Sequence, residues 1–156
     1  MATRSTIAIE NADGTVDQIY GHWDGYLRGV GATLVKHYTD RSKVEQLIAQ
    51  GAVSILAPEI GTEHPFSRHD APLDNRLAQE EWDALYENMC TFYARDRGED
   101  LHVSKFKDIA DYEANHEFQE FEYLFTADDV WSVFYNDEWA DLEYELQQLD
   151  SLETTA

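Results

Sequence analysis

Residues 5–10 and 15–23 have the apolar and β-branched composition of strands, and they flank the polar stretch 11–14. That stretch ends in Asp13-Gly14, a strong short-range signal for a hairpin turn. We therefore expect the chain to open with a β-hairpin. The glycine-rich sequence GHWDGYLRGVG follows and is expected to leave the sheet.

Helical spacing of apolar residues begins after this segment, with Leu27, Val30, Leu34 and Tyr38 recurring on one face. A second helix is expected to start at Ser42, where Ser42 and Glu45 have the spacing of a capping box. Gly51 is expected to end this helix.

All three prolines fall within residues 57–77, which predicts a long loop there. Helical spacing then returns through Trp82, Leu85, Tyr86 and Met89. Residues 90–95, in contrast, have the composition of a strand.

The last third of the chain predicts a short helix over 107–116 and a second hairpin, with strands 117–126 and 130–136 around the turn 127–129. Residues 137–152 are expected to form a final helix. Its apolar stripe comprises Trp139, Leu142, Leu146 and Leu149. Together the patterns predict one α+β domain over residues 1–156, an antiparallel sheet of about five strands with helices mainly on one face.

Charge adds a second level of organisation. The chain has 156 residues and a formal net charge of −21, yet 43% of its residues are hydrophobic and 13% are aromatic, which is too many for a disordered chain. Residues 1–57 hold 6 acids and 5 bases, whereas residues 108–156 hold 15 acids and no Lys or Arg. Adaptation to high salt would spread acids over the whole surface, and a disordered acidic tail would lack aromatics. We therefore interpret residues 108–156 as a folded acidic segment.

This charge excludes several classes of ligand. A net charge of this sign repels nucleic acid and anionic membranes, so the natural partner is a basic protein surface. The single cysteine, Cys90, allows no intrachain disulfide and indicates a reducing compartment. The start MATRSTIAIE has no signal-peptide pattern, and no stretch reaches the length of about 18 apolar residues that a membrane span needs.

The acidic segment predicts a regular array of carboxylates. On a strand, Glu120 and Glu122 would share a face about 6.6 Å apart. On a helix, Asp137, Asp141 and Glu145 would stand about 6 Å apart along the axis, because they are spaced four residues apart. Such spacing resembles the phosphates of one nucleic-acid strand. The complete predicted partner-binding set is Glu120, Glu122, Asp128, Asp129, Asp137, Glu138, Asp141 and Glu145.

The simpler alternative is that these acids form a solvated helix face, as acidic runs on helices usually do. Two features weigh against it. No acid of the segment has a Lys or Arg four residues after it, and the imbalance extends over a strand, a turn and a helix together. Imitation of a DNA surface is therefore the favoured interpretation.

Other candidate sites give weaker signals. His22 and Asp24 resemble a base and its orienting acid, but a structural turn explains them better. His64, His69 and Asp70 in the proline-containing loop lack a recognised metal-ligand spacing, and Asp128-Asp129 lacks a calcium-loop pattern. No motif for a catalytic nucleophile is present. We predict no enzymatic activity, no metal and no cofactor.

The segments MATRSTIAIENADGTVDQIYGHWDGY, KHYTD and CTFYARDRGED resemble a group of small phage proteins, and within it the phage-encoded DNA gyrase inhibitors, which are Igy-like DNA mimics. The similarity covers mainly residues 1–61 and 90–100, largely outside the acidic third, so it transfers no functional residue. It implies a protein made in an infected bacterium and acting in the host cytoplasm, with host DNA gyrase as its partner.

Three other functions remain open on the sequence. One is inhibition of a restriction or CRISPR complex by the same mimicry. Another is a small metal-dependent hydrolase that uses His22, Asp24 and the loop over 57–77. The third is an acidic adaptor that binds a basic protein without imitating DNA. The sequence also leaves open whether the protein acts as a monomer or as a homodimer.

Overall fold

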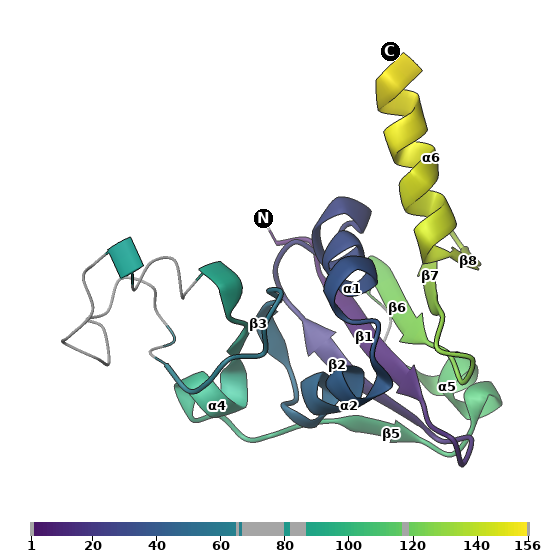
Figure 1. Ribbon diagram of the computed structural model, residues 1–156. Coiled ribbons are helices and arrows are strands. Elements are labelled where there is room, and N and C mark those ends of the chain that lie inside the picture. The colour runs from purple at the N-terminus through teal and green to yellow at the C-terminus, as the bar shows by residue number, and fades with distance from the viewer. Residues whose placement is uncertain (1, 65, 67–79, 82–86, 117–118, 156) are drawn as a thin grey trace.

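A single mixed β-sheet forms the body of the computed structural model, which describes residues 2–64, 66, 80–81, 87–116 and 119–155 (Figure 1). The strands run in the order β4-β3-β2-β1-β6-β7-β8, and β5 also pairs with β2. Their bounds are β1 Ser5–Glu10, β2 Val16–Gly21, β3 Val53–Ile55, β4 Thr91–Phe92, β5 Ser104–Phe106, β6 Phe121–Phe125, β7 Trp131–Tyr135 and β8 Glu138–Asp141. The helices are η1 Leu27–Gly31, which is π-helical, and α1 Ala32–His37, α2 Arg41–Ala49, α4 Tyr93–Arg97, α5 Ile109–Asn115 and α6 Leu142–Thr155.

The prediction of about five antiparallel strands is wrong, because the sheet has more strands and two of its pairings are parallel. Strand β1 runs parallel to β6, with Ile7 opposite Tyr123, and β2 meets β3 in parallel at Gly21 and Val53. Both predicted hairpins are present, β1 with β2 and β6 with β7. The direction of one hairpin relative to the other depends on the long connection between β2 and β6. Local hydrophobic patterns do not indicate this direction.

Most of the apolar core lies on one face of the sheet. Helices η1, α1, α2 and α6 pack there, over side chains such as Ile7, Ile19 and Val133. Helix α5 covers part of the opposite face, where Tyr112 packs against Ala8 and Leu124. The hairpin β1–β2 and the helical spacing from Leu27 to Tyr38 thus follow the predictions, the latter as η1 and α1.

Two local predictions need correction. Helix α2 starts at Arg41 because Asp40, and not Ser42, is its N-cap; the Asp40 carboxylate accepts the Ser42 N–H at 2.9 Å. The strand expected over 90–95 is only Thr91–Phe92, because Asp96 accepts the Phe92 N–H at 2.8 Å and the chain turns into α4. In that position Asp96 acts like the acidic member of a helix-start motif.

The predicted loop and helix between β3 and β4 are only partly described. Residues 57–64 form neither helix nor strand apart from an isolated bridge between Glu59 and Met89. Trp82, Leu85 and Tyr86 of the predicted helix lie outside the described residues. Among the residues that are described, no helix is both long and apolar enough to cross a bilayer.

The final helix starts later than predicted. Residues 138–141 form β8, and α6 begins only at Leu142 and then extends away from the body of the molecule (Figure 1). Trp139 packs with Phe134 on the α5 side of the sheet, whereas Leu142, Leu146 and Leu149 join the core on the other side. The predicted four-residue stripe is therefore divided between the two faces of the sheet.

Candidate functional site: the acidic edge of the sheet

Strands β6, β7 and β8 form an antiparallel edge, which we call the acidic edge together with its two turns and the first turns of α6. Asn136 and Asp137 link β7 to β8, and both have positive φ angles, 52° and 66°. A two-residue turn of this kind is type I′, whose twist matches that of the paired strands. Asn-Asp is a weaker signal for it than Asn-Gly, which is why the sequence prediction continued a helix through this point.

Six of the eight predicted carboxylates separate into two groups at opposite ends of these strands, whereas Glu122 lies within β6 and Glu145 in α6. Asp128 and Asp129 lie in the β6–β7 turn, and Asp141 lies at the same end, because it faces Ser132 at the start of β7. Glu120, Asp137 and Glu138 lie at the other end. The two ends are about 14 Å apart, since β7 rises about 3.4 Å per residue over four steps.

The regular row predicted for Asp137, Asp141 and Glu145 does not exist. Asp137 lies in the turn, and Asp141 ends β8, where its carboxylate accepts the Tyr144 N–H at 2.9 Å as the cap of α6. Glu145 is half-buried and accepts a short hydrogen bond from the Tyr135 hydroxyl. This hydrogen bond to Glu145 raises the pKa of Tyr135 to about 12.

Glu122 does not face solvent with Glu120, because it is fully buried under α5. One carboxylate oxygen, Oε1, lies 2.5 Å from His116 Nδ1, and burial raises the pKa of the Glu122 carboxyl while His116 opposes the rise. Side chains alternate along β6 as predicted, but α5 covers the face of the sheet on which Glu122 lies. Glu122 is thus part of the interior and is withdrawn from the partner-binding set.

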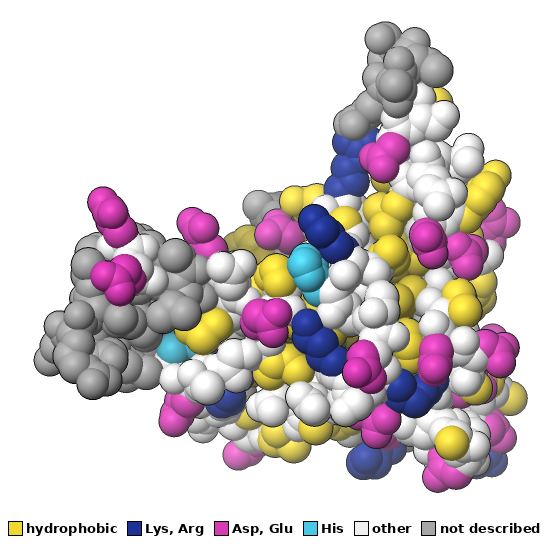
Figure 2. Space-filling view, in the orientation of Figure 1, with side chains coloured by type: hydrophobic (Ala, Val, Ile, Leu, Met, Phe, Trp, Pro, Cys, Tyr) yellow, Lys and Arg dark blue, Asp and Glu magenta, His cyan; other side chains and the backbone are white. Residues whose placement is uncertain are grey.

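The other predicted carboxylates reach the surface. Glu120, Asp128, Asp129, Asp137, Glu138 and Asp141 are exposed. In Figure 2 acidic side chains gather along the right-hand edge of the molecule, where Figure 1 shows β7, β8 and α6. Within the described part of the chain, Asp129 is the only one of the eight in an ion pair with Lys or Arg.

Arg41 is the cation of that ion pair, and it anchors the β6–β7 turn to the body. Its Nε lies 2.7 Å from Asp129 Oδ1, while its two NH groups donate to the carbonyls of Glu10 and Thr126 at 3.0 and 2.6 Å. The guanidinium also lies over the Phe125 ring, 5.0 Å from the centroid. The turn that presents Asp128 and Asp129 is therefore held in one position.

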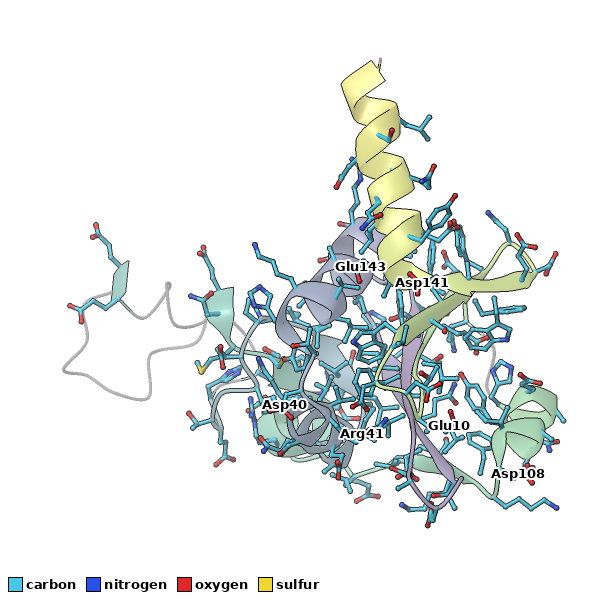
Figure 3. All side chains as sticks on the ribbon, turned by 45° about the vertical axis from the view of Figure 1, so that its right-hand side comes forward. Glu10, Asp40, Arg41, Asp108, Asp141 and Glu143 are labelled. Atoms are coloured by element: carbon cyan, nitrogen blue, oxygen red, sulfur yellow. The ribbon has the colours of Figure 1, made fainter. Side chains whose placement is uncertain are left out.

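Between this turn and the start of α6 lies a small hollow that we call the acidic groove, with a volume of about 120 Å³. Figure 3 shows Asp141 and Glu143 next to each other where β8 passes into α6. Glu143 was not in the predicted set; its place on the rim depends on the β8–α6 junction, which the sequence pattern did not reveal. The lining residues are Val35, Thr39, Phe125, Asp129, Val130, Trp131, Asp141 and Glu143.

The catalytic alternative based on His22 and Asp24 gains no geometric support. His22 Nδ1 is hydrogen-bonded to the Tyr20 hydroxyl at 2.7 Å, and its ring packs edge-on against Trp23. Asp24 has a φ of 58° and its carbonyl accepts the Val30 N–H, so it shapes the turn into η1. These contacts give both residues structural roles.

The loop and the cysteine are likewise engaged in structural contacts. His64 is buried, and its Nε2 lies 2.9 Å from the Cys90 carbonyl oxygen, whereas His69 and Asp70 lie outside the described residues. Burial raises the pKa of the Cys90 thiol, which lies 3.3 Å from the Tyr38 hydroxyl. In the described parts of the chain, no three His, Cys, Asp or Glu side chains converge on a point where they could hold a metal ion.

No protein-family model, curated protein or solved structure matches this chain.

Proposed function

We propose that the protein binds the basic DNA-binding surface of a partner protein and thereby excludes DNA from it. The observation that carries the proposal is the acidic edge, a three-stranded frame on which six of the predicted carboxylates are exposed and only Asp129, among the described residues, pairs with a Lys or Arg. Like charges held together raise the free energy of the folded chain. A basic partner surface that binds the edge removes this repulsion. Such a partner would explain why the edge carries many acids and few bases.

The arrangement of the charges supports the same partner class. The two acidic ends stand about 14 Å apart by strand geometry. The major groove of B-DNA is about 12 Å wide, so a protein that grips phosphates on both sides of it carries basic residues at a similar separation. Two separated groups of carboxylates thus support a DNA-binding partner surface, in place of the single regular row of carboxylates that the sequence predicts.

DNA gyrase is the partner that we propose for the test, because the resemblance of residues 1–61 and 90–100 to phage gyrase inhibitors implies it. In that setting the protein would act in the cytoplasm of an infected host. Gyrase is also a convenient test system, since loss of DNA binding is read directly as loss of supercoiling.

The experiment compares two triple variants of equal charge in a gyrase supercoiling assay. The test variant carries Asp128→Asn, Asp137→Asn and Glu138→Gln on the acidic edge. The control carries Glu59→Gln, Glu63→Gln and Asp100→Asn, which are exposed positions away from that edge. We expect the test variant to lose at least 10-fold in inhibition and the control to lose less than 2-fold. Equal loss in both would show that only net charge matters and would refute the assignment to the edge.

Salt provides an independent readout of the same proposal. Added salt screens the repulsion within the acidic edge and also the attraction to a basic partner. Between 50 and 200 mM salt we therefore expect the melting temperature of the free protein to rise and the affinity for gyrase to fall. Affinity that is unchanged by salt would contradict the electrostatic mechanism.

A further inference from the structure

The acidic groove combines an apolar floor with a negatively charged rim. Val35 from α1 and Val130 from the β6–β7 turn are its more exposed apolar residues, and Phe125 and Trp131 lie beneath them, fully and almost fully buried. The only polar group of the Trp131 ring, its indole N–H, donates to the Tyr38 carbonyl at 2.9 Å, so this ring offers only its carbon surface. A ligand group that enters the groove must therefore be able to pack against carbon.

The size of the groove limits what can occupy it. Its volume of about 120 Å³ exceeds the roughly 10–15 Å³ that one water requires. Pockets for small-molecule ligands are larger, at about 300–1,000 Å³. The groove thus suits a single side chain of a partner protein.

Charge selects a cation. The rim presents Asp129, Asp141 and Glu143, and none of the lining residues is Lys or Arg. Arg41 reaches Asp129 from outside the groove and lies over the ring of Phe125. The same two residues therefore already accommodate one guanidinium, against an aromatic ring and a carboxylate.

We propose that the acidic groove receives an arginine side chain from the partner's DNA-binding surface, an inference that rests on the proposed function. Arginine fits better than lysine because its planar guanidinium is weakly hydrated and can pack against carbon, while it still pairs with carboxylates. A charged side chain that is desolvated in a small interface pocket contributes a large share of the binding energy. The groove is then the anchor point of the acidic edge.

The test fills the groove with an arginine of the protein itself. Thr39 lines the groove and is exposed, so Thr39→Arg places a guanidinium at its mouth. Thr62→Arg is the matched control, because Thr62 is also exposed and lies outside the groove. Glu143→Gln serves as a second test variant that removes one rim charge without adding bulk.

The probe is a hexa-arginine peptide, titrated into the full chain and followed by NMR of the Val35 and Val130 methyl groups and the Trp131 indole N–H. We expect saturable shifts of these signals in the unmodified protein and in Thr62→Arg. We expect Thr39→Arg to weaken binding at least 10-fold and Glu143→Gln to weaken it about 3-fold or more. Equal affinity in Thr39→Arg and Thr62→Arg would overturn the proposal, and so would equally tight binding of hexa-lysine at these signals.

A parallel gyrase supercoiling assay separates this inference from the proposed function. Full inhibition by both Thr39→Arg and Thr62→Arg would overturn the role of the groove and leave the proposed function intact. Hexa-arginine binding at the groove, without any inhibition by the unmodified protein, would overturn the proposed function and leave the guanidinium site in place.

Discussion

The buried pair formed by Glu122 and His116 gives the sharpest prediction about stability. Glu122 is fully buried, and its Oε1 lies 2.5 Å from His116 Nδ1. Removing the partner of a buried, hydrogen-bonded carboxyl costs about 1–3 kcal/mol, and more when that group is charged. We therefore expect His116→Ala to lower the unfolding free energy by about 1–3 kcal/mol or more. For a chain of this size, each kcal/mol corresponds to a melting-temperature decrease of about 2–4 °C.

The partner variant should behave differently. Glu122→Gln removes the charge and keeps an acceptor for the His116 ring, so we expect it to change stability by less than about 1.5 kcal/mol. The double variant His116→Ala/Glu122→Gln should be more stable than His116→Ala alone, since no buried charge is left unpaired. Urea unfolding at pH 7, followed by circular dichroism, measures all three. A loss below 1 kcal/mol in His116→Ala, or a double variant no more stable than that single variant, would refute the reasoning.

The same pair predicts a pH dependence. Burial raises the pKa of Glu122 above its ordinary value of 4.5, so the folded state holds this proton more tightly than the unfolded chain does. The resulting stabilisation is complete below pH 4.5 and is lost as the pH rises through the folded-state pKa, by about 1.4 kcal/mol for each unit of the shift. Glu122→Gln should therefore flatten the decline of unfolding free energy above pH 4.5. An unchanged slope in urea unfolding between pH 4 and 8 would show that Glu122 does not titrate in this way.

Three further predictions concern the frame of the acidic edge and the turn into η1. Arg41→Lys should cost about 2 kcal/mol in urea unfolding, because lysine cannot keep all three hydrogen bonds of the fork, including the one to Asp129; a loss below 0.5 kcal/mol would contradict this. Gly29→Ala should destabilise by about 1–3 kcal/mol or more, because an added Cβ would meet the backbone oxygen of Asp24 at 2.2 Å; unchanged melting would show that the turn relaxes. Asp137→Gly should stabilise by up to about 1 kcal/mol in thermal unfolding, since its φ of 66° suits glycine; a lower melting temperature would argue against the type I′ turn.

Much of the local structure was predictable because local patterns determine it. The Asp13-Gly14 turn indicates the first hairpin, and the spacing from Leu27 to Tyr38 indicates the helical segment that follows. The parallel pairing of β1 with β6 was not predictable in this way. It joins residues that are more than 100 positions apart, and only packing of the complete core decides the direction of the two hairpins.

The acidic edge was predictable by composition but not by geometry. The absence of Lys and Arg after residue 107 identified the segment as acidic, and its aromatic residues identified it correctly as folded. The position of each carboxylate depended on two features that the sequence shows only weakly. Positive φ angles at Asn136 and Asp137 turn residues 138–141 into a strand, and α5 covers the face on which Glu122 lies. These features split the expected row of charges and placed Glu143 on the rim of the acidic groove.

Competition between the acidic edge and DNA for a basic protein surface is tested most directly by displacement of a fluorescently labelled DNA duplex from gyrase, measured by anisotropy at 100 mM salt. We predict that the unmodified protein displaces the duplex completely and that Asp128→Asn/Asp137→Asn/Glu138→Gln requires at least a 10-fold higher concentration. Binding of the protein to gyrase with the duplex still attached would contradict this competition.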